Sequence, residues 1–108
     1  MDENIENQVY KKYYYHRTSH WLGMDVHDVG RYRTGDKWTV LKPGMVITVE
    51  PGLYISSDDE HDKFRNIGVR IEDDVLITSE GHRNLSASCP KEIRDLESII
   101  GTGPERLL

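Results

Sequence analysis

The chain has 108 residues and a formal net charge of −5, and its lysines and arginines are interleaved with 19 acidic residues. This length allows one domain with a small core, and without a basic stripe we expect no nucleic-acid partner. No apolar run approaches the roughly 20 residues of a membrane span, so we expect no membrane partner. A single cysteine, Cys89, and an acidic start without an apolar leader predict a cytoplasmic protein.

The first predicted element is an amphipathic helix over residues 3–14. Apolar or aromatic side chains recur there at three- and four-residue spacing, at Ile5, Val9, Tyr10 and Tyr13. Acidic side chains head the segment, where they suit the helix dipole. The spacing and the charges therefore favour a helix near the start of the chain.

Short β-type segments are predicted for the centre of the chain. Glycine and proline divide it into pieces rich in valine, isoleucine and threonine, which predicts an antiparallel sheet. Residues 56–66 have no apolar period and are expected to form an exposed loop.

A second helix is predicted to begin at Pro90, which suits a first helical position, and to end at Gly101. Isoleucine and leucine form an apolar stripe along it. The expected fold class is α+β, with an antiparallel sheet flanked by two helices. We expect one domain over residues 1–101 and a tail over residues 102–108.

Three candidate metal ligands, His20, Glu50 and Glu72, stand in separate strand-like segments. One imidazole and two carboxylates suit Mn, Zn, Fe or Co, and are richer in carboxylate than a typical structural zinc site. Strand alternation places Arg70 on the same face as Glu72, where a guanidinium can orient a ligand carboxylate. The alternative is a solvated charged face, or for Glu50 the surface end of a strand.

Two further histidines flank the candidate ligand. His16 lies four residues before His20, but the residues that follow suggest that a helix has already ended, so the two need not bind one ion. His27 has the chemistry of a proton carrier or hydrogen-bond donor near neutral pH. The alternative for each is an ordinary surface or satisfied core histidine.

Three longer motifs, at residues 19–30, 41–54 and 67–74, closely resemble the C-terminal part of aminopeptidase P, the bacterial Xaa-Pro aminopeptidase. That enzyme is one of the pita-bread metallopeptidases, which also include prolidase and methionine aminopeptidase. The resemblance covers the chain from the first predicted helix to about residue 100. It implies the C-terminal half of a pita-bread fold.

The resemblance also implies a metal site. In the family, two ions, commonly Mn(II), are held by two aspartates, one histidine and two glutamates. The match implies that His20 is the histidine ligand, that Glu50 binds the same ion, and that Glu72 bridges both ions.

Catalytic roles are implied in the same way. His16 and His27 match two histidines that contact the scissile carbonyl and assist proton transfer, and Arg70 matches an arginine that organises the site. The implied substrate is a peptide with proline at its second position.

Two departures from the family affect these expectations. The family's aspartate ligands lie upstream of the histidine motif, and this chain begins after their position. We therefore expect at most one ion in this chain alone, no activity in isolation, and either a homo-oligomer or pairing with the N-terminal half. Arg17 stands where many relatives have glycine, and its cation either meets a substrate carboxylate or reaches solvent.

Three functions remain open from the sequence. The first is part of an Xaa-Pro aminopeptidase, and the second is part of a prolidase that takes Xaa-Pro dipeptides. The third is a non-catalytic remnant that binds a peptide or a partner.

Overall fold

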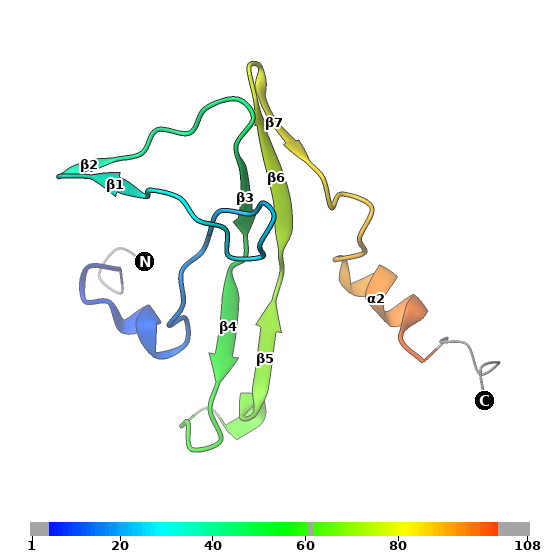
Figure 1. Cartoon of the computed structure of the whole chain (residues 1–108). Helices are drawn as coiled ribbons and strands as arrows, with labels where there is room; N and C mark the ends of the chain where they lie inside the picture. The colour runs from blue at the N-terminus through cyan, green and yellow to red at the C-terminus, as the bar shows by residue number, and fades with distance from the viewer. Residues whose placement is uncertain (1–4, 61, 102–108) are drawn as a thin grey trace.

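The computed structural model describes residues 5–60 and 62–101. The chain forms short strands and helices joined by long connections (Figure 1). In chain order they are η1 (Val9–Lys12), β1 (Arg33–Thr34), β2 (Lys37–Trp38), β3 (Val46–Val49), β4 (Gly52–Ile55), η2 (Asp62–Phe64), β5 (Ile67–Arg70), β6 (Asp73–Thr78), β7 (Gly81–Asn84) and α2 (Ile93–Ile99).

All strand pairing is antiparallel, which confirms the predicted pairing and the α+β class. The strands form three sheets instead of one: β3-β6-β7, β4-β5 and the small β1-β2 hairpin. In Figure 1, β4 continues the line of β3, and β6 continues the line of β5. The two larger sheets therefore follow one another along a single long ladder.

Pro51 interrupts that ladder without changing its register. Val49 pairs with Asp73 on one side of the interruption and Gly52 pairs with Arg70 on the other, so each strand advances by the same number of residues. The Ile71 N–H still donates to the Pro51 carbonyl at 3.1 Å. Proline has no N–H to return that hydrogen bond, which explains the local break.

Residues 18–22 run along the other edge of β3. They add an antiparallel neighbour to that strand, which includes a bridge between Trp21 and Ile47. The hydrogen bonds are Leu22 N–H to Val46 O at 3.1 Å, Thr48 N–H to His20 O at 3.0 Å and Glu50 N–H to Thr18 O at 2.7 Å. The strand β3 is thus held on both edges.

The helix predicted over residues 3–14 is wrong in extent, and residues 3 and 4 lie outside the described part of the chain. Residues 5 and 6 are helical, but Gln8 has φ 57° and ψ 24°, and only the 3-10 helix η1 follows. A left-handed residue stops α-helical hydrogen bonding, and no residue of η1 is buried. Short helices depend on packing for stability, and this one has little.

The second helix, α2, begins three residues after the predicted Pro90 and ends just before the predicted Gly101. The segment before it is held in a loop, because Lys91 Nζ donates to the carbonyls of Ser86 at 2.9 Å and Cys89 at 3.0 Å. No α2 residue is buried, and Figure 1 shows the helix projecting away from the strands. The predicted flanking of the sheet by two helices is therefore wrong.

Apolar side chains remain open to solvent in this chain. Among the described residues no apolar side chain is fully buried; the buried residues there are Thr48, Glu50 and Asp59. The Cα radius of gyration is 17.9 Å, against about 13 Å for a compact domain of this length. An apolar groove of about 620 Å³ lies on the β3-β6-β7 sheet and includes Val49, Val75 and Ile77.

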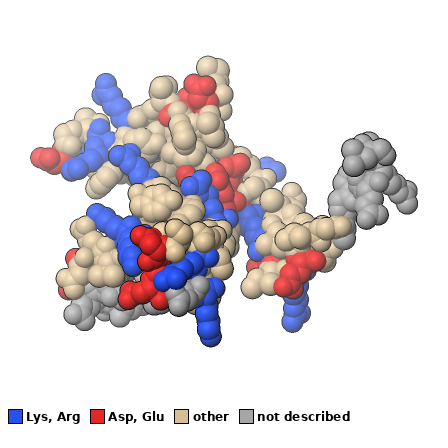
Figure 2. Space-filling view, turned by 90° about the horizontal axis from the view of Figure 1, so that it is seen from below, with Lys and Arg blue, Asp and Glu red and all other residues tan. Residues whose placement is uncertain are grey.

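Charged side chains of both signs share the surface. On the face seen in Figure 2, lysine and arginine atoms adjoin aspartate and glutamate atoms instead of forming one patch of a single sign. In the described residues no helix has the length and apolar character needed to cross a bilayer.

Candidate metal centre

The ladder brings three candidate ligands to one face. Because the register continues past Pro51, Glu50 faces Glu72, and residues that face each other across an antiparallel pair project to the same side. His20 lies opposite Thr48, two positions before Glu50, and so shares that side. One ligand atom from each of His20, Glu50 and Glu72 lies within 4.8 Å of the others.

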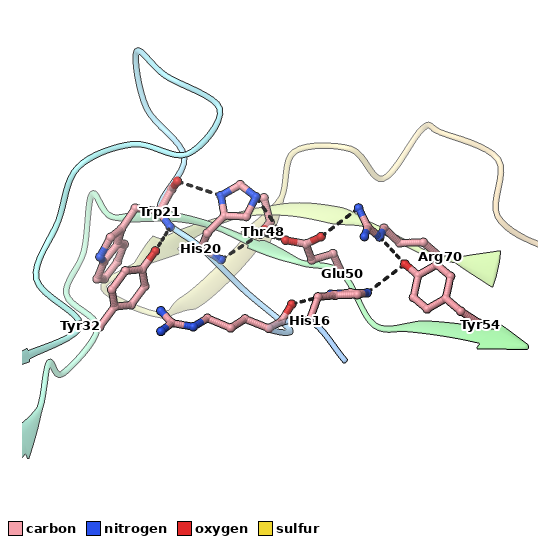
Figure 3. Close-up of polar contacts among 9 residues, drawn as sticks. His16, His20, Trp21, Tyr32, Thr48, Glu50, Tyr54 and Arg70 are labelled. Carbon is pink, nitrogen blue, oxygen red and sulfur yellow. Dashed lines mark hydrogen bonds and ion pairs between the residues drawn. The ribbon is translucent and has the colours of Figure 1, made fainter. Parts of the chain in front are cut away.

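The orientation of His20 prepares one nitrogen for a cation. Its Nδ1 lies 2.9 Å from the Trp21 carbonyl, which can only accept, so Nδ1 carries the proton. Its Nε2 then faces Glu50 Oε1 at 3.2 Å (Figure 3). Two acceptors this close repel each other unless a proton or a metal ion lies between them. The donor set and its geometry therefore fit a divalent cation bound through Nε2 and the two carboxylates.

Glu50 is fixed by two further groups. Its side chain is largely buried, and the Thr48 hydroxyl donates to Oε1 at 3.3 Å. Arg70 Nη1 lies 3.4 Å from Oε2. The pKa of Arg70 is raised above its ordinary value. The largest cause is the hydrogen bond to the Tyr54 hydroxyl, and the negative charges of Glu50 and Glu72 add to it. Arg70 therefore stays positively charged beside the ligand cluster.

Tyr54, to which the sequence reasoning assigned no role, links Arg70 to His16. Arg70 Nε donates to the Tyr54 hydroxyl at 2.8 Å, and that hydroxyl lies 2.9 Å from His16 Nε2. His16 Nδ1 lies 2.8 Å from the Arg17 carbonyl, so Nδ1 carries the proton and Nε2 accepts from Tyr54. Figure 3 shows this chain of contacts running from Glu50 to His16.

A sequence signal for Tyr54 does exist. Tyr54 stands two positions after Gly52 on β4 and faces Gly68 on β5. A Cβ added at Gly52 would lie 2.4 Å from the Tyr54 hydroxyl oxygen, and one at Gly68 would lie 3.0 Å from a ring carbon. The two glycines leave room for the ring, and strand alternation places it on the face of Glu50 and Glu72.

His27 approaches the cluster from the connection after residue 22. Its ring centroid is 4.4 Å from that of His20, with the rings nearly perpendicular. A cavity of about 430 Å³ opens here. It is lined by His16, Arg17, Ser19, His20, His27, Tyr32, Glu50 and Arg70. The structure thus gathers five of the six predicted site residues around one cavity, and Glu72 joins the ligand cluster beside it.

Comparison with known proteins gives a consistent result. Residues 1–79 match the model of metallopeptidase family M24. The Xaa-Pro aminopeptidase of Haemophilus influenzae is 52% identical over 101 residues, which are 93% of this chain and 23% of that protein.

Solved structures agree with the sequence match. The Pseudomonas aeruginosa aminopeptidase PepP has a TM-score of 0.87 at 51% identity, over 94% of this chain and 23% of its own. Aminopeptidase P from Escherichia coli with the inhibitor Pro-Leu has a TM-score of 0.84 at 49% identity, over 92% of this chain and 23% of its own. The chain therefore has the fold of one part of these larger enzymes and spans about a quarter of their length.

Proposed function

The chain belongs to metallopeptidase family M24, and from that membership we propose that it supplies part of the active site of an Xaa-Pro aminopeptidase. The reaction is hydrolysis of the bond between an N-terminal residue and a following proline. The observation that carries the proposal is the convergence of His20, Glu50 and Glu72 on one face. Domain limits of 1–101 with a tail over 102–108 are part of the proposal.

The proposed metal ligands are His20, Glu50 and Glu72, and the proposed metal is Mn(II), with two ions in the longer enzyme and at most one in this chain alone. When bound, a divalent cation supplies charge that lowers the pKa of water and stabilises a developing oxyanion. The carboxylate-rich donor set supports a metal of this class. The described residues offer one set of metal ligands, so we propose that the isolated chain is inactive.

Three residues have proposed catalytic roles beside the cluster: His16, His27 and Arg70. No hydrogen bond to the His27 ring is formed within the described residues, so it is available to donate to the substrate carbonyl. His16 is proposed to steady the substrate carbonyl; both of its nitrogens are engaged in this structure, so substrate would replace Tyr54 at Nε2. Arg70 keeps the Glu50 carboxylate oriented.

The proposed partners are a peptide substrate and a second polypeptide. The relatives named Xaa-Pro aminopeptidase support a peptide with proline at its second position as substrate, and the E. coli relative binds the proline-containing inhibitor Pro-Leu. The open apolar groove supports pairing with the remaining part of a longer enzyme, or a homo-oligomer. The cytoplasmic location stays a prediction.

Prolidase remains the second candidate function. Comparing the cleavage of tripeptides with that of dipeptides by the longer enzyme separates the two candidates.

Metal content provides the first test. The chain is incubated with Mn(II) and analysed for metal per polypeptide, in parallel with hydrolysis of Ala-Pro-Ala. We expect one ion or fewer and no turnover, with loss of that ion in His20→Ala. Unchanged metal in a folded His20→Ala variant would show that the ligand assignment is wrong. Two ions with turnover in the isolated chain would contradict the proposed dependence on a longer enzyme.

A further inference from the structure

Two arginines line the cavity beside the ligand cluster, and they differ in how their charge is used. Arg70 is committed to the Tyr54 hydroxyl and to Glu50. Arg17 makes no ion pair with any described residue, and its side chain is exposed at the cavity wall. Of the two arginines, Arg17 is therefore the one whose guanidinium N–H groups are available to a ligand in the cavity.

The Arg17 guanidinium lies over a fixed aromatic surface. Its central carbon is 5.6 Å from the centroid of the Tyr32 ring. That ring stacks on Trp21 at 5.5 Å, and its hydroxyl accepts a hydrogen bond from the backbone N–H of Trp21 at 3.1 Å. A cation–π contact holds a guanidinium near a ring while its N–H groups remain able to donate to a bidentate partner. The arrangement reduces the entropy cost of binding a planar anion.

The backbone of Arg17 is fixed as well. Its carbonyl accepts a hydrogen bond from His16 Nδ1–H, and the other ring nitrogen of His16 is hydrogen-bonded to the Tyr54 hydroxyl. The side chain therefore starts from an anchored position two residues from Ser19, within the same cavity wall. A volume of about 430 Å³ lies within the range of small-ligand sites.

We propose that Arg17 binds a carboxylate of the peptide held in this cavity. The site therefore prefers peptides that have a carboxylate within reach of Arg17. This inference deepens the proposed function and rests on it. The carboxylate comes either from the C-terminus of a short peptide or from an acidic side chain after the proline. Both present two oxygens in a plane, which match the paired donors of a guanidinium.

Peptide titrations followed by two-dimensional NMR test the inference on the whole 108-residue chain loaded with Zn(II). The probes are Ala-Pro-Ala, its C-terminal amide, and amidated Ala-Pro-Glu and Ala-Pro-Gln. Wild type is compared with Arg17→Ala, Arg17→Lys and the control Arg31→Ala. Arg31 is also exposed but does not line this cavity. Metal binding by each variant reports whether the ligand cluster is intact.

In wild type we expect Ala-Pro-Ala to bind about tenfold more tightly than its amide, as a charge-assisted pair predicts. The ratio should fall to near one in Arg17→Ala, recover in part in Arg17→Lys, and stay unchanged in Arg31→Ala. A preference for amidated Ala-Pro-Glu over Ala-Pro-Gln instead assigns the carboxylate to a side chain. Equal binding of acids and amides by wild type overturns the role of Arg17 and leaves the proposed function standing. Failure of every peptide to bind metal-loaded wild type also overturns the role of Arg17, whereas the proposed function is decided separately by the metal content of wild type and His20→Ala.

Discussion

Glu50 and Glu72 face each other across the point where Pro51 interrupts the long antiparallel ladder. The interruption removes one hydrogen bond but keeps the register, so the two carboxylates point to the same side of the sheet. Facing like charges destabilise a strand pair unless a cation lies near them. This local conflict is resolved by Arg70 and, on our proposal, by a metal ion.

The first prediction concerns Glu72→Gln, which removes one charge and keeps the side-chain shape. Divalent-cation affinity should fall by more than the roughly 10- to 100-fold that loss of an outer-shell partner costs, because a direct ligand is lost. Calorimetric titration with Mn(II) and Zn(II) measures the change. Glu80→Gln, an exposed glutamate at the β6–β7 turn, is the matched control. Equal affinities in the two variants would exclude Glu72 as a ligand.

The second prediction concerns the Tyr54 hydroxyl. Tyr54→Phe removes the hydrogen bonds to both Arg70 and His16, and at about 0.5–1.5 kcal/mol for each it should reduce the free energy of unfolding by about 1–3 kcal/mol. Metal affinity should fall less than in Glu72→Gln, because Arg70 loses a partner while the ligands remain. Urea unfolding and metal titration measure the two effects. Tyr15→Phe removes a hydroxyl from an exposed ring that contacts Tyr54, and it should change neither quantity.

The third prediction concerns the space that glycine leaves for Tyr54. Gly52→Ala places a Cβ 2.4 Å from the Tyr54 hydroxyl oxygen, so the ring must move away from His16 and Arg70. We expect a loss of about 1–3 kcal/mol in unfolding free energy, as for other overpacked sites. The same substitution in a Tyr54→Ala background should cost much less, because the clash is gone. An equal cost in both backgrounds would place the strain elsewhere.

The sequence was sufficient to propose the ligands but not their arrangement. Valine and isoleucine alternation indicated strands on both sides of Glu50 and Glu72, and Pro51 indicated an extended residue before it. That these two glutamates face each other depends on a pairing between segments about 20 residues apart, which local patterns do not specify. Their roles as ligands stay predictions.

The errors in helix prediction share one physical cause. The stripes at the two ends of the chain have helical spacing, but in η1 and α2 no residue is buried. A periodic pattern predicts that a helix has an apolar face, whereas its length depends on what that face packs against. Tyr54 was missed for a related reason, because its hydroxyl gains its partners only when β4 lies beside both β5 and residues 13–17.

The last prediction concerns the pH dependence of stability through Asp73. The pKa of Asp73 is lowered to about 2. The main cause is Lys91 at 2.9 Å, and hydrogen bonds from Ser86 and Asn84 contribute less. The unfolded-state pKa is about 3.9, so the folded state holds the proton less tightly. The stabilisation is therefore present above about pH 4 and disappears as the pH falls towards about 2.

Urea unfolding of wild type and Asp73→Asn across this pH range measures the effect. Wild type should be the more stable protein at pH 5, and its advantage should shrink steadily on acidification because the carboxylate is protonated and the pair with Lys91 is lost. Asp36→Asn, at an exposed turn position, should give a difference that does not change with pH. A constant advantage of wild type over Asp73→Asn down to pH 2 would mean that the charge of Asp73 does not contribute, and that only its shape and hydrogen bonds do.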